Sequence, residues 1–310
     1  MTTPSDDALW QRYLFALRTS TLEWLPSEPF QLRVEYQLYD LDGRPTVKGT
    51  AQETWTETDG KQVRIQSPTL VIGDNPPADE DAVFTRESYL VHQAMDALSR
   101  PFPSSTQHND FGMAEFRQTL AGSELSCFSL VQAGKTRAPN TPAYCTDPDN
   151  HIVAMTGPLF VLERSNFRRY RRHEIPLDLK LSYEGRPALT MHVSELDPLP
   201  DTAVSKSETK PTSGRTRVPG GIISGLALKQ KEPKYPAIAK AAHIQGEVVI
   251  VAIIAKQGTI AAMDVIASPD KILTKAAKDA VQTWTYQPYL LNGVPTEVET
   301  TITVNFAMGK

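Results

Sequence analysis

The sequence predicts an α+β protein made of a mostly antiparallel β domain, a flexible linker and a small β-αβ module with a three-stranded sheet. Three observations predict this class. Apolar and polar residues alternate in several stretches before residue 197, a segment rich in Pro, Ser and Thr follows, and a strand–strand–helix–strand pattern ends the chain. At 310 residues the chain is long enough for two domains with separate cores. We therefore expect domains at 1–197 and 218–310, joined by a linker at 198–217.

The first domain is expected to begin with a helix and to continue as a series of hairpins. Apolar residues recur at helical spacing over 9–25, and a second helix is expected at 86–99. Residues 30–38 alternate strictly, and a DLDGRP turn leads into a return strand at 46–58. Further strands are expected around 63–65, at 125–131, 143–147, 151–162, 175–183 and 188–196. Hairpins that share one apolar face predict a single large curved sheet.

The alternating strands place a row of apolar side chains on one face of this sheet. The row includes Leu32, Val34, Tyr36, Leu38 and Trp55. Two interpretations stay open: these side chains form the core of the domain, or they line an apolar groove that holds a ligand. A groove requires more apolar lining than the helices can fill.

The linker is recognised by its composition. Residues 198–217 read DPLPDTAVSKSETKPTSGRT, with many Pro, Ser, Thr and charged residues and very few apolar side chains. Such a segment buries too little surface to offset the entropy cost of ordering it. We expect a flexible tether.

The last domain has the clearest local signals. Residues 248–255 are apolar at both odd and even positions and rich in β-branched side chains, which predicts a strand covered on both faces. Gly258 marks a turn before a return strand at 259–267. A helix is expected to follow, with Ser268 as its N-cap and Pro269 as its first residue, and to run through Trp284.

The final strand alternates between an apolar and a polar face. The first face carries Val298, Thr300, Ile302, Val304 and Phe306. The second face carries Glu297, Glu299, Thr301, Thr303 and Asn305. Together with the two strands before it, this strand completes a three-stranded sheet against one long helix.

The module thus combines a Tyr-Pro pair, turn glycines and a tryptophan at fixed spacings. The positions are Tyr235, Pro236, Ala239, Gly246, Val248, Gly258, Ser268, Leu273, Ala276, Ala280, Val281, Trp284, Pro288, Gly293, Pro295, Val298 and Phe306. In this pattern, roughly residues 220–310 resemble the C-terminal domain of TonB-type energy transducers. That resemblance implies protein binding at an outer membrane and no catalysis.

In the TonB family the last strand lies at or near a sheet edge and can pair with an extended peptide of a receptor. Carried over, the resemblance implies that the strand from Glu297 to Asn305 binds an outer-membrane receptor or another envelope protein by β-strand addition. Two alternatives stay open: the strand only completes the fold, or it pairs with a second copy of the domain.

The resemblance implies a periplasmic or other envelope location. Transducers of this family are held by an N-terminal transmembrane helix and a long Pro-rich spacer. The sequence has no apolar stretch near 18 residues and no signal peptide at Met1. Either a leader was removed, or the domain serves as a passive binding module.

The first domain shows a second resemblance. It rests on the order of helix, long strand, DxDG-type turn and strand with tryptophan, and on Gly43, Gly49, Trp55, Arg64, Ser67 and Pro68. In these features the domain resembles the half-barrel of periplasmic lipoprotein carriers, which wrap a sheet around a helix and shelter acyl chains. The alternative function that this implies is a carrier of lipid or another hydrophobic ligand.

The two cysteines, Cys127 and Cys145, lie in separate strand-like stretches. They form either a disulfide or two buried thiols, and the envelope location that the TonB resemblance implies favours the disulfide.

Composition and motifs argue against several other functions. A net charge of -4 and a pI near 5.9 argue against nucleic-acid binding. The histidines form no HxH or HExxH pattern, and no G-x-S-x-G, P-loop or G-x-G-x-x-G is present. We therefore expect no enzyme, no cofactor and no metal site. The segment TDPDN at 146–150 is interpreted as a turn, and RRYRR at 168–172 as a solvated strand end or loop.

Overall fold

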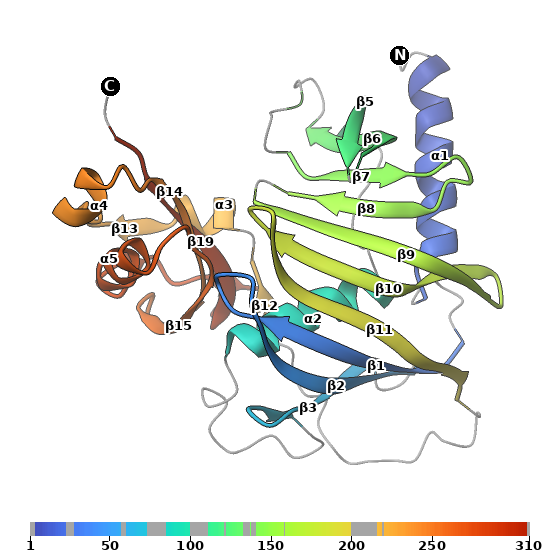
Figure 1. Cartoon of the computed structure of the whole chain (residues 1–310), viewed down its shortest axis with the longest axis horizontal. Coiled ribbons are helices and arrows are strands. Elements are labelled where there is room, and N and C mark those ends of the chain that lie inside the picture. The colour runs from blue at the N-terminus through green and yellow to red at the C-terminus, as the bar shows by residue number, and fades with distance from the viewer. Residues whose placement is uncertain are drawn as a thin grey trace. The chain divides into compact units, whose positions relative to one another are not determined.

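The computed structural model of the chain describes residues 4–22, 28–56, 60–72, 85–99, 111–120, 122–132, 137, 141–157, 159–199, 216–218 and 220–308. The chain forms two compact units (Figure 1). The N-terminal unit comprises Met1–Gly73 and Val91–Ser207, and the C-terminal unit comprises Asp74–Leu90 and Glu208–Lys310. The boundaries expected from the sequence, 1–197, 198–217 and 218–310, stay a prediction, because residues 201–215 lie outside the described part of the chain.

The N-terminal unit is built on one sheet of eleven strands (Figure 1). From edge to edge the order is β4 (Val71–Ile72), β3 (Gly60–Gln66), β2 (Pro45–Thr56), β1 (Phe30–Tyr39), β11 (Arg186–Pro198), β10 (His173–Tyr183), β9 (Phe160–Tyr170), β8 (Ile152–Thr156), β7 (Ala143–Thr146), β6 (Ser123–Gln132) and β5 (Phe111–Leu120). The first and last of these strands in the chain, β1 and β11, pair in the middle of the sheet. The single large sheet predicted from the alternating pattern is confirmed.

Two parts of this sheet differ from the expectation. Residues 151–162 form two strands instead of one, because the Gly157 amide donates to the Phe160 carbonyl at 2.9 Å and closes a turn. The strand β5 was not expected, since its sequence, FGMAEFRQTL, alternates weakly. It exists because it pairs with β6 over its whole length.

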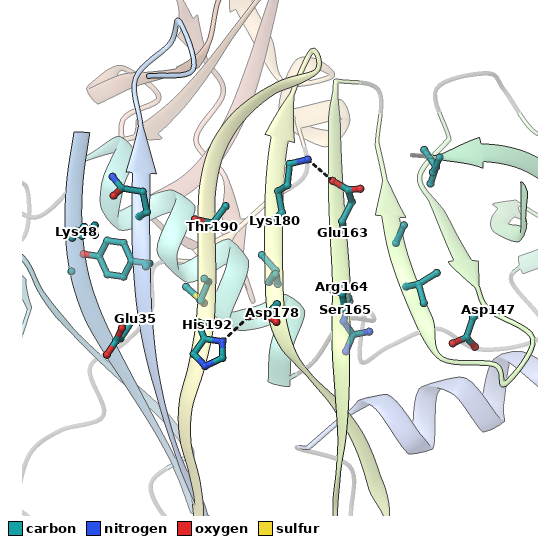
Figure 2. A pocket seen from close by; sticks show the side chains of 18 of the residues that line it. Glu35, Lys48, Asp147, Glu163, Arg164, Ser165, Asp178, Lys180, Thr190 and His192 are labelled. Carbon is teal, nitrogen blue, oxygen red and sulfur yellow. Dashed lines mark hydrogen bonds and ion pairs between the residues drawn. The ribbon is translucent and has the colours of Figure 1, made fainter. Parts of the chain in front are cut away.

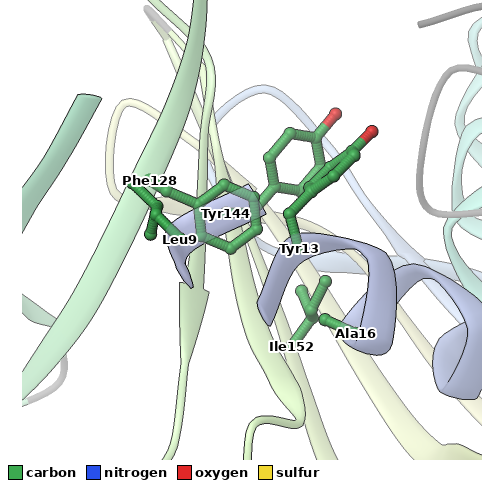
Figure 3. Close-up of a cluster of buried hydrophobic side chains, with 6 residues drawn as sticks. All are labelled: Leu9, Tyr13, Ala16, Phe128, Tyr144 and Ile152. Carbon is green, nitrogen blue, oxygen red and sulfur yellow. The ribbon is translucent and has the colours of Figure 1, made fainter. Parts of the chain in front are cut away.

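Helix α1 (Pro4–Ser20) covers one face of the sheet near β6, β7 and β8 (Figure 3). Its buried side chains Leu9, Tyr13 and Ala16 pack against Phe128, Tyr144 and Ile152. The rings of Tyr13 and Phe128 meet edge to face, with centroids 5.6 Å apart. Cross-strand pairing continues this apolar row through Leu162, Leu181, Leu189 and Leu38.

Helix α2 (Arg86–Ser99), which has the expected bounds, is bonded to the same face of the sheet. The Tyr183 hydroxyl on β10 donates to Oε1 of Gln93 at 2.9 Å. Lys61 on β3 forms ion pairs with the fully buried Glu53 on β2 at 2.9 Å and with Asp96 on the helix at 2.8 Å. Both helices therefore lie on one face, and the opposite face carries none of the helices described in this unit.

The C-terminal unit contains a four-stranded sheet in the order β12 (Thr216–Arg217), β19 (Val298–Phe306), β14 (Gly246–Ile254) and β15 (Ile260–Ala267). Helix α5 (Lys271–Val281) lies against β14 and buries Leu273, Ala277, Ala280 and Val281. The remaining elements are α3 (Gly220–Ser224), α4 (Ala237–Ala241), the paired strands β13 (Ala227–Lys229) and β16 (Thr285–Tyr286), and the hairpin of β17 (Leu290–Leu291) and β18 (Val294–Pro295). The three expected strands are present, and β12 adds a fourth.

Helix α5 begins later and ends earlier than the sequence indicated. Its N-cap is Asp270, whose Oδ1 accepts a hydrogen bond from the Ile272 amide at 2.6 Å. Ser268, the expected cap, instead donates its hydroxyl to the Asp270 carbonyl at 2.9 Å. A carboxylate at the positive helix end is favoured electrostatically as well as by hydrogen bonding. Trp284 lies beyond the helix, where its Nε1 donates to the Lys231 carbonyl at 2.8 Å.

Candidate functional site

The candidate binding site of the C-terminal unit is the outer edge of β19. The inner side of this strand is fully used, because it pairs with β14 from Val298 beside Ile254 to Phe306 beside Gly246 without a register shift. The strand β14 in turn pairs with β15, so it lies in the middle of the sheet. The backbone groups of β19 that point away from β14 are therefore the ones available to a further strand.

One hydrogen bond shows which backbone groups these are. The Val218 amide donates to the Glu299 carbonyl at 2.9 Å, on the side where β12 pairs with β19. Backbone groups along a strand alternate in direction with a period of two residues. The N–H and C=O groups of Thr301, Thr303 and Asn305 therefore point to the same outer side as those of Glu299.

The chain itself covers the start of this outer edge. In β12, Thr216 lies beside Val298 and Arg217 beside Glu299, in a parallel arrangement. Beyond this point, no backbone hydrogen bond among the described residues reaches the outer side of β19. We call residues Thr301–Phe306 the open edge segment.

The side chains of the expected partner strand divide by face much as the sequence indicates. Those on the apolar face are buried: Val298, Thr300, Ile302, Val304 and Phe306. On the other face, Thr301 is half-buried, and Thr303 and Asn305 are exposed. Glu299 departs from the pattern with 8% exposure, and Glu297 precedes the strand. That a partner pairs with these residues stays a prediction.

The remaining motif residues have roles in the fold of this unit. Tyr235 donates its hydroxyl to the Ile244 carbonyl at 2.7 Å, and its ring meets Phe306 edge to face at 5.5 Å. Pro236 occupies the N-cap position of α4. Three further residues mark turns and ends: Gly246 and Gly258 have positive φ, and Pro288 is exposed after β16.

The N-terminal unit has an open trough of about 1010 Å³ on the face of the sheet away from the helices (Figure 2). Its floor consists of two neighbouring cross-strand rows of mainly polar residues. One row contains Glu163, Lys180, Thr190, Gln37 and Lys48, and the other contains Ser165, Asp178, His192, Glu35 and Thr50. Leu120 and Leu125 of β5 and β6 are at its apolar end.

Two ion pairs lie on this polar floor (Figure 2). Glu163 and Lys180 lie 3.0 Å apart, and Nδ1 of His192 donates to Oδ1 of Asp178 at 2.6 Å. The hydrogen bond from His192 is the largest cause that lowers the pKa of Asp178 below its ordinary value, against a smaller upward effect of burial. Asn166 adds a second hydrogen bond, at 3.1 Å. A polar ligand at Glu163, Lys180, Asp178 or His192 would therefore compete with bonds that these residues already make.

A disulfide between Cys127 and Cys145 supports the apolar end of the trough. The two residues lie directly opposite one another on β6 and β7 and are fully buried. Together with Ala154 they form a small core, on which Leu120 and Leu125 pack from the trough side. The disulfide favoured in the sequence analysis is therefore confirmed.

The side chains expected to line an apolar groove lie elsewhere in the structure. Leu32, Val34, Tyr36, Leu38 and Trp55 are each at most 9% exposed. Of these five, Tyr36 also borders the trough. Its ring lies over Gly49, where an added Cβ would overlap the hydroxyl group. As folded here the five residues belong to the core, and a ligand groove lined by them stays a prediction.

A buried arginine on β9 was missed in the sequence analysis. Arg164 is 2% exposed, and its Nη1 donates to the Ile152 carbonyl at 3.3 Å. Its Nε and Nη2 have no hydrogen-bond acceptor among the described residues. Burial lowers the pKa of Arg164 to about 9, so the guanidinium is still charged at neutral pH. The local sequence, LERSN, gave no signal of burial.

The TDPDN segment forms the expected turn, with the Asn150 amide donating to the Asp147 carbonyl at 3.0 Å. Side-chain atoms of Asp147, Asp149 and His151 come within 4.8 Å of one another. His151 already uses Nδ1 to bond Asp147 at 2.8 Å, and Asp149 is exposed. This cluster is explained by the turn.

The edge geometry and the motif roles define a small module of one sheet and one main helix, and comparison shows which family this module resembles. Residues 231–308 match the family described as the Gram-negative bacterial TonB protein C-terminal. This region is a TonB C-terminal domain, and the resemblance found in the sequence is confirmed. The solution NMR structure of the Pseudomonas aeruginosa TonB C-terminal domain is 26% identical, with a TM-score of 0.25, and the match covers 27% of this chain and 86% of that one.

The N-terminal unit is similar to two solved structures at low identity. One is a putative outer membrane lipoprotein-sorting protein domain from Vibrio parahaemolyticus, with 9% identity, a TM-score of 0.38, and coverage of 66% of this chain and 95% of that one. The other is a LolA superfamily protein from Nitrosomonas europaea, with 10% identity, a TM-score of 0.33, and coverage of 64% and 98%. None of the curated proteins compared matches the chain. In the described ranges, no helix has both the length and the apolar character to cross a bilayer.

Proposed function

We propose that this protein is an envelope binding protein of TonB-dependent transport, whose C-terminal unit binds an extended peptide of an outer-membrane receptor by β-strand addition. The observation that carries the proposal is the open edge segment of β19 in a TonB C-terminal domain. Its outward N–H and C=O groups can form the same ladder with a foreign backbone that β14 forms on the inner side. Strand addition needs no catalytic group, so the expectation that the protein is not an enzyme belongs to the same proposal.

The proposal is tested by removing one outward amide without changing the rest of the strand. Thr303 is exposed, and its N–H makes no backbone hydrogen bond among the described residues. Proline lacks this N–H and is tolerated on edge strands where the N–H faces solvent. We expect Thr303→Pro to weaken the binding of N-terminal peptides from outer-membrane receptors by about fivefold or more, since one ladder bond contributes about 1 kcal/mol. Isothermal titration calorimetry on the full chain measures this.

Thr303→Val is the matched control, because it changes the same side chain and keeps the amide. We expect it to bind the peptides as the natural chain does. Circular dichroism of both variants checks that the fold is retained. If proline and valine at this position bind equally well, strand addition at this edge is excluded. If the natural chain dimerises in a concentration-dependent way and Thr303→Pro abolishes this dimerisation, the outer edge of β19 pairs with a second copy of the chain.

The second candidate function is a carrier of lipid or another hydrophobic ligand, and the trough on the face of the sheet away from α1 and α2 favours it. The trough is about 1010 Å³ in volume and combines an apolar end with a polar floor, as an amphipathic ligand requires. Native mass spectrometry after mild purification tests this function, and co-purified lipid would support it. A chain that carries no lipid and binds receptor peptides supports strand addition alone.

A further inference from the structure

We infer that the tip of the β9–β10 hairpin binds the surface of a bilayer that contains anionic phospholipids, through the phosphate groups of the lipid heads. This function goes beyond receptor binding at β19 and does not depend on it. It also differs from lipid carriage in the trough, since the protein attaches to a membrane and takes no lipid out of it. The residues that carry the inference are Arg168, Arg169, Arg171 and Arg172, which flank Tyr170.

The end of this hairpin has no neighbouring strand on either side (Figure 1). The ladder between β8 and β9 reaches no further than Glu163, and the ladder between β10 and β11 begins only at Asp178. Residues 165–177, which we call the arm, therefore pair only with one another among the described strands. The arm is fixed to the unit by Ile175, which is fully buried. Its tip is thus an accessible and ordered part of the sheet.

The four arginines at the tip of the arm are all exposed. Arg168 and Arg169 are successive residues of β9, so their side chains leave the hairpin on opposite faces. Arg171 and Arg172 form the turn that leads into β10. A bilayer offers mobile anionic headgroups over a flat surface, which meets charges on both faces and at the turn when the tip approaches it. Guanidinium groups suit this contact because they bind phosphate oxygens in a bidentate manner.

The backbone of the turn places an arginine where a smaller residue is usual. Arg171 has a φ of 55°, in the left-handed region that glycine or asparagine commonly occupies in tight hairpin turns. An ion pair with Glu28 holds its side chain, and its guanidinium carbon lies 5.3 Å from the centroid of the Tyr170 ring. The Arg171 carbonyl also accepts a hydrogen bond from Nε of Arg169 at 3.2 Å. A charged residue kept in a costly conformation points to a function at that position.

The tip is positive in a chain that is otherwise acidic. Glu174 lies across from Arg169, and Asp197 interacts electrostatically with Tyr170, so carboxylates offset part of the positive charge. Arg168 forms no ion pair and no hydrogen bond within the described ranges. The four arginines contribute +4 to a net charge of -4, so the rest of the chain carries -8. An anionic surface therefore attracts the protein at the arm and repels most of the remaining chain, which fixes the orientation of binding.

Co-sedimentation of the full chain with sucrose-loaded vesicles tests the inference. The vesicles contain phosphatidylcholine alone or phosphatidylcholine with about one-third phosphatidylglycerol, which is anionic. We expect the chain to bind only the second kind. This binding should be lost when the salt concentration rises from about 0.1 M to about 1 M, because the screening length falls from about 10 Å to about 3 Å. Equal binding to both kinds of vesicle would overturn the inference.

A double variant tests whether the arm carries the binding. We expect Arg168→Gln with Arg169→Gln to weaken binding to the anionic vesicles by about thirtyfold, since each basic side chain near such a surface contributes about fivefold. Arg168→Lys with Arg169→Lys keeps both charges and should restore most of the affinity. Arg44→Gln with Arg117→Gln is the matched control, because it removes the same charge from two exposed arginines outside the arm. This control should bind the vesicles as the natural chain does, and circular dichroism checks that all variants are folded.

The outcomes distinguish this inference from the proposed function. If the glutamine variant of the arm binds anionic vesicles as well as the control variant does, the inference is overturned. If the natural chain binds polyglutamate but no vesicles, and the glutamine variant of the arm binds neither, the arm recognises an acidic protein and the inference is again overturned. None of these variants changes β19, so each of these failures leaves receptor binding by strand addition as it stands.

Discussion

The turn at Gly258 allows a quantitative prediction about the stability of the C-terminal unit. Gly258 has a φ of 87°, which is a left-handed conformation. Its amide donates to the Ala255 carbonyl at 2.8 Å, and its carbonyl accepts from the Tyr286 amide at 2.8 Å. A Cβ added here would overlap the carbonyl oxygen of Tyr286. The turn between β14 and β15 is therefore pressed against the strand β16.

Two costs add up when Gly258 is replaced by alanine. The left-handed conformation costs an alanine about 1–2 kcal/mol. The overlap is with a backbone atom, so no side-chain rotation relieves it, and overpacking of this kind costs about 1–3 kcal/mol. We expect Gly258→Ala to lower the free energy of unfolding of the C-terminal unit by about 3 kcal/mol or more.

Gly293→Ala is the matched control, since Gly293 has a φ of 82° and no atom of the described residues lies within 4 Å of an added Cβ. It bears only the conformational cost, about 1–2 kcal/mol. Hydrogen exchange of β14, measured by mass spectrometry in increasing urea, reports the stability of this unit in the full chain. If Gly258→Ala and Gly293→Ala lower the free energy of unfolding equally, the overlap with the Tyr286 carbonyl oxygen adds no cost and the argument is refuted.

Three further predictions concern the N-terminal unit. Replacing Cys127 and Cys145 by serine opens a loop with a sequence separation of 18. We expect this change to lower the free energy of unfolding of the N-terminal unit, measured in urea under oxidising conditions, by about 3 kcal/mol. A decrease below about 1 kcal/mol would contradict this. The pKa of Asp178 is lower in the folded state than in the unfolded state. The ionised Asp178 carboxylate therefore stabilises the fold at pH values above its unfolded-state pKa, and this stabilisation is lost as the pH falls through its folded-state pKa. Asp178→Asn should therefore flatten the acid end of a melting-temperature profile below about pH 4, and an unchanged profile would argue against the His192 bond. Arg164→Met removes a buried cation that makes one hydrogen bond and lies 5.9 Å from the centroid of the Phe167 ring, while keeping its aliphatic volume. We expect unfolding stability to rise by about 1–3 kcal/mol, whereas a fall would show that these two contacts outweigh the cost of burying the charge.

Much of the C-terminal fold could be predicted because its signals are local. An unbroken apolar run predicted β14, and β14 is buried on both faces from Val248 to Ile254. Strict alternation predicted β19 and the faces of its side chains. The start of α5 was misplaced because two capping residues compete within three positions, and Asp270 combines the hydrogen bond with a favourable charge.

The parts that could not be predicted depend on contacts between distant segments. The strand β12 lies at the end of a segment with the composition of a linker, and it is a strand only because β19 lies beside it. The trough brings together polar residues from five strands, and single-strand patterns do not reveal which of them meet. Arg164 has polar neighbours in sequence, but the register of β9 with β10 puts it beside Leu179, and its guanidinium lies over the Phe167 ring.

The pairing of β1 with β11 has a consequence for biosynthesis. Phe30 lies beside Pro198, so the middle of the large sheet cannot close until nearly two-thirds of the polypeptide has left the ribosome. Until then β1 has only β2 as a neighbouring strand. Nascent chains should therefore depend on chaperones until β11 has been synthesised. In the later TonB-like region, the paired strands lie within about 60 residues of one another in the sequence. This region should therefore fold promptly once it emerges.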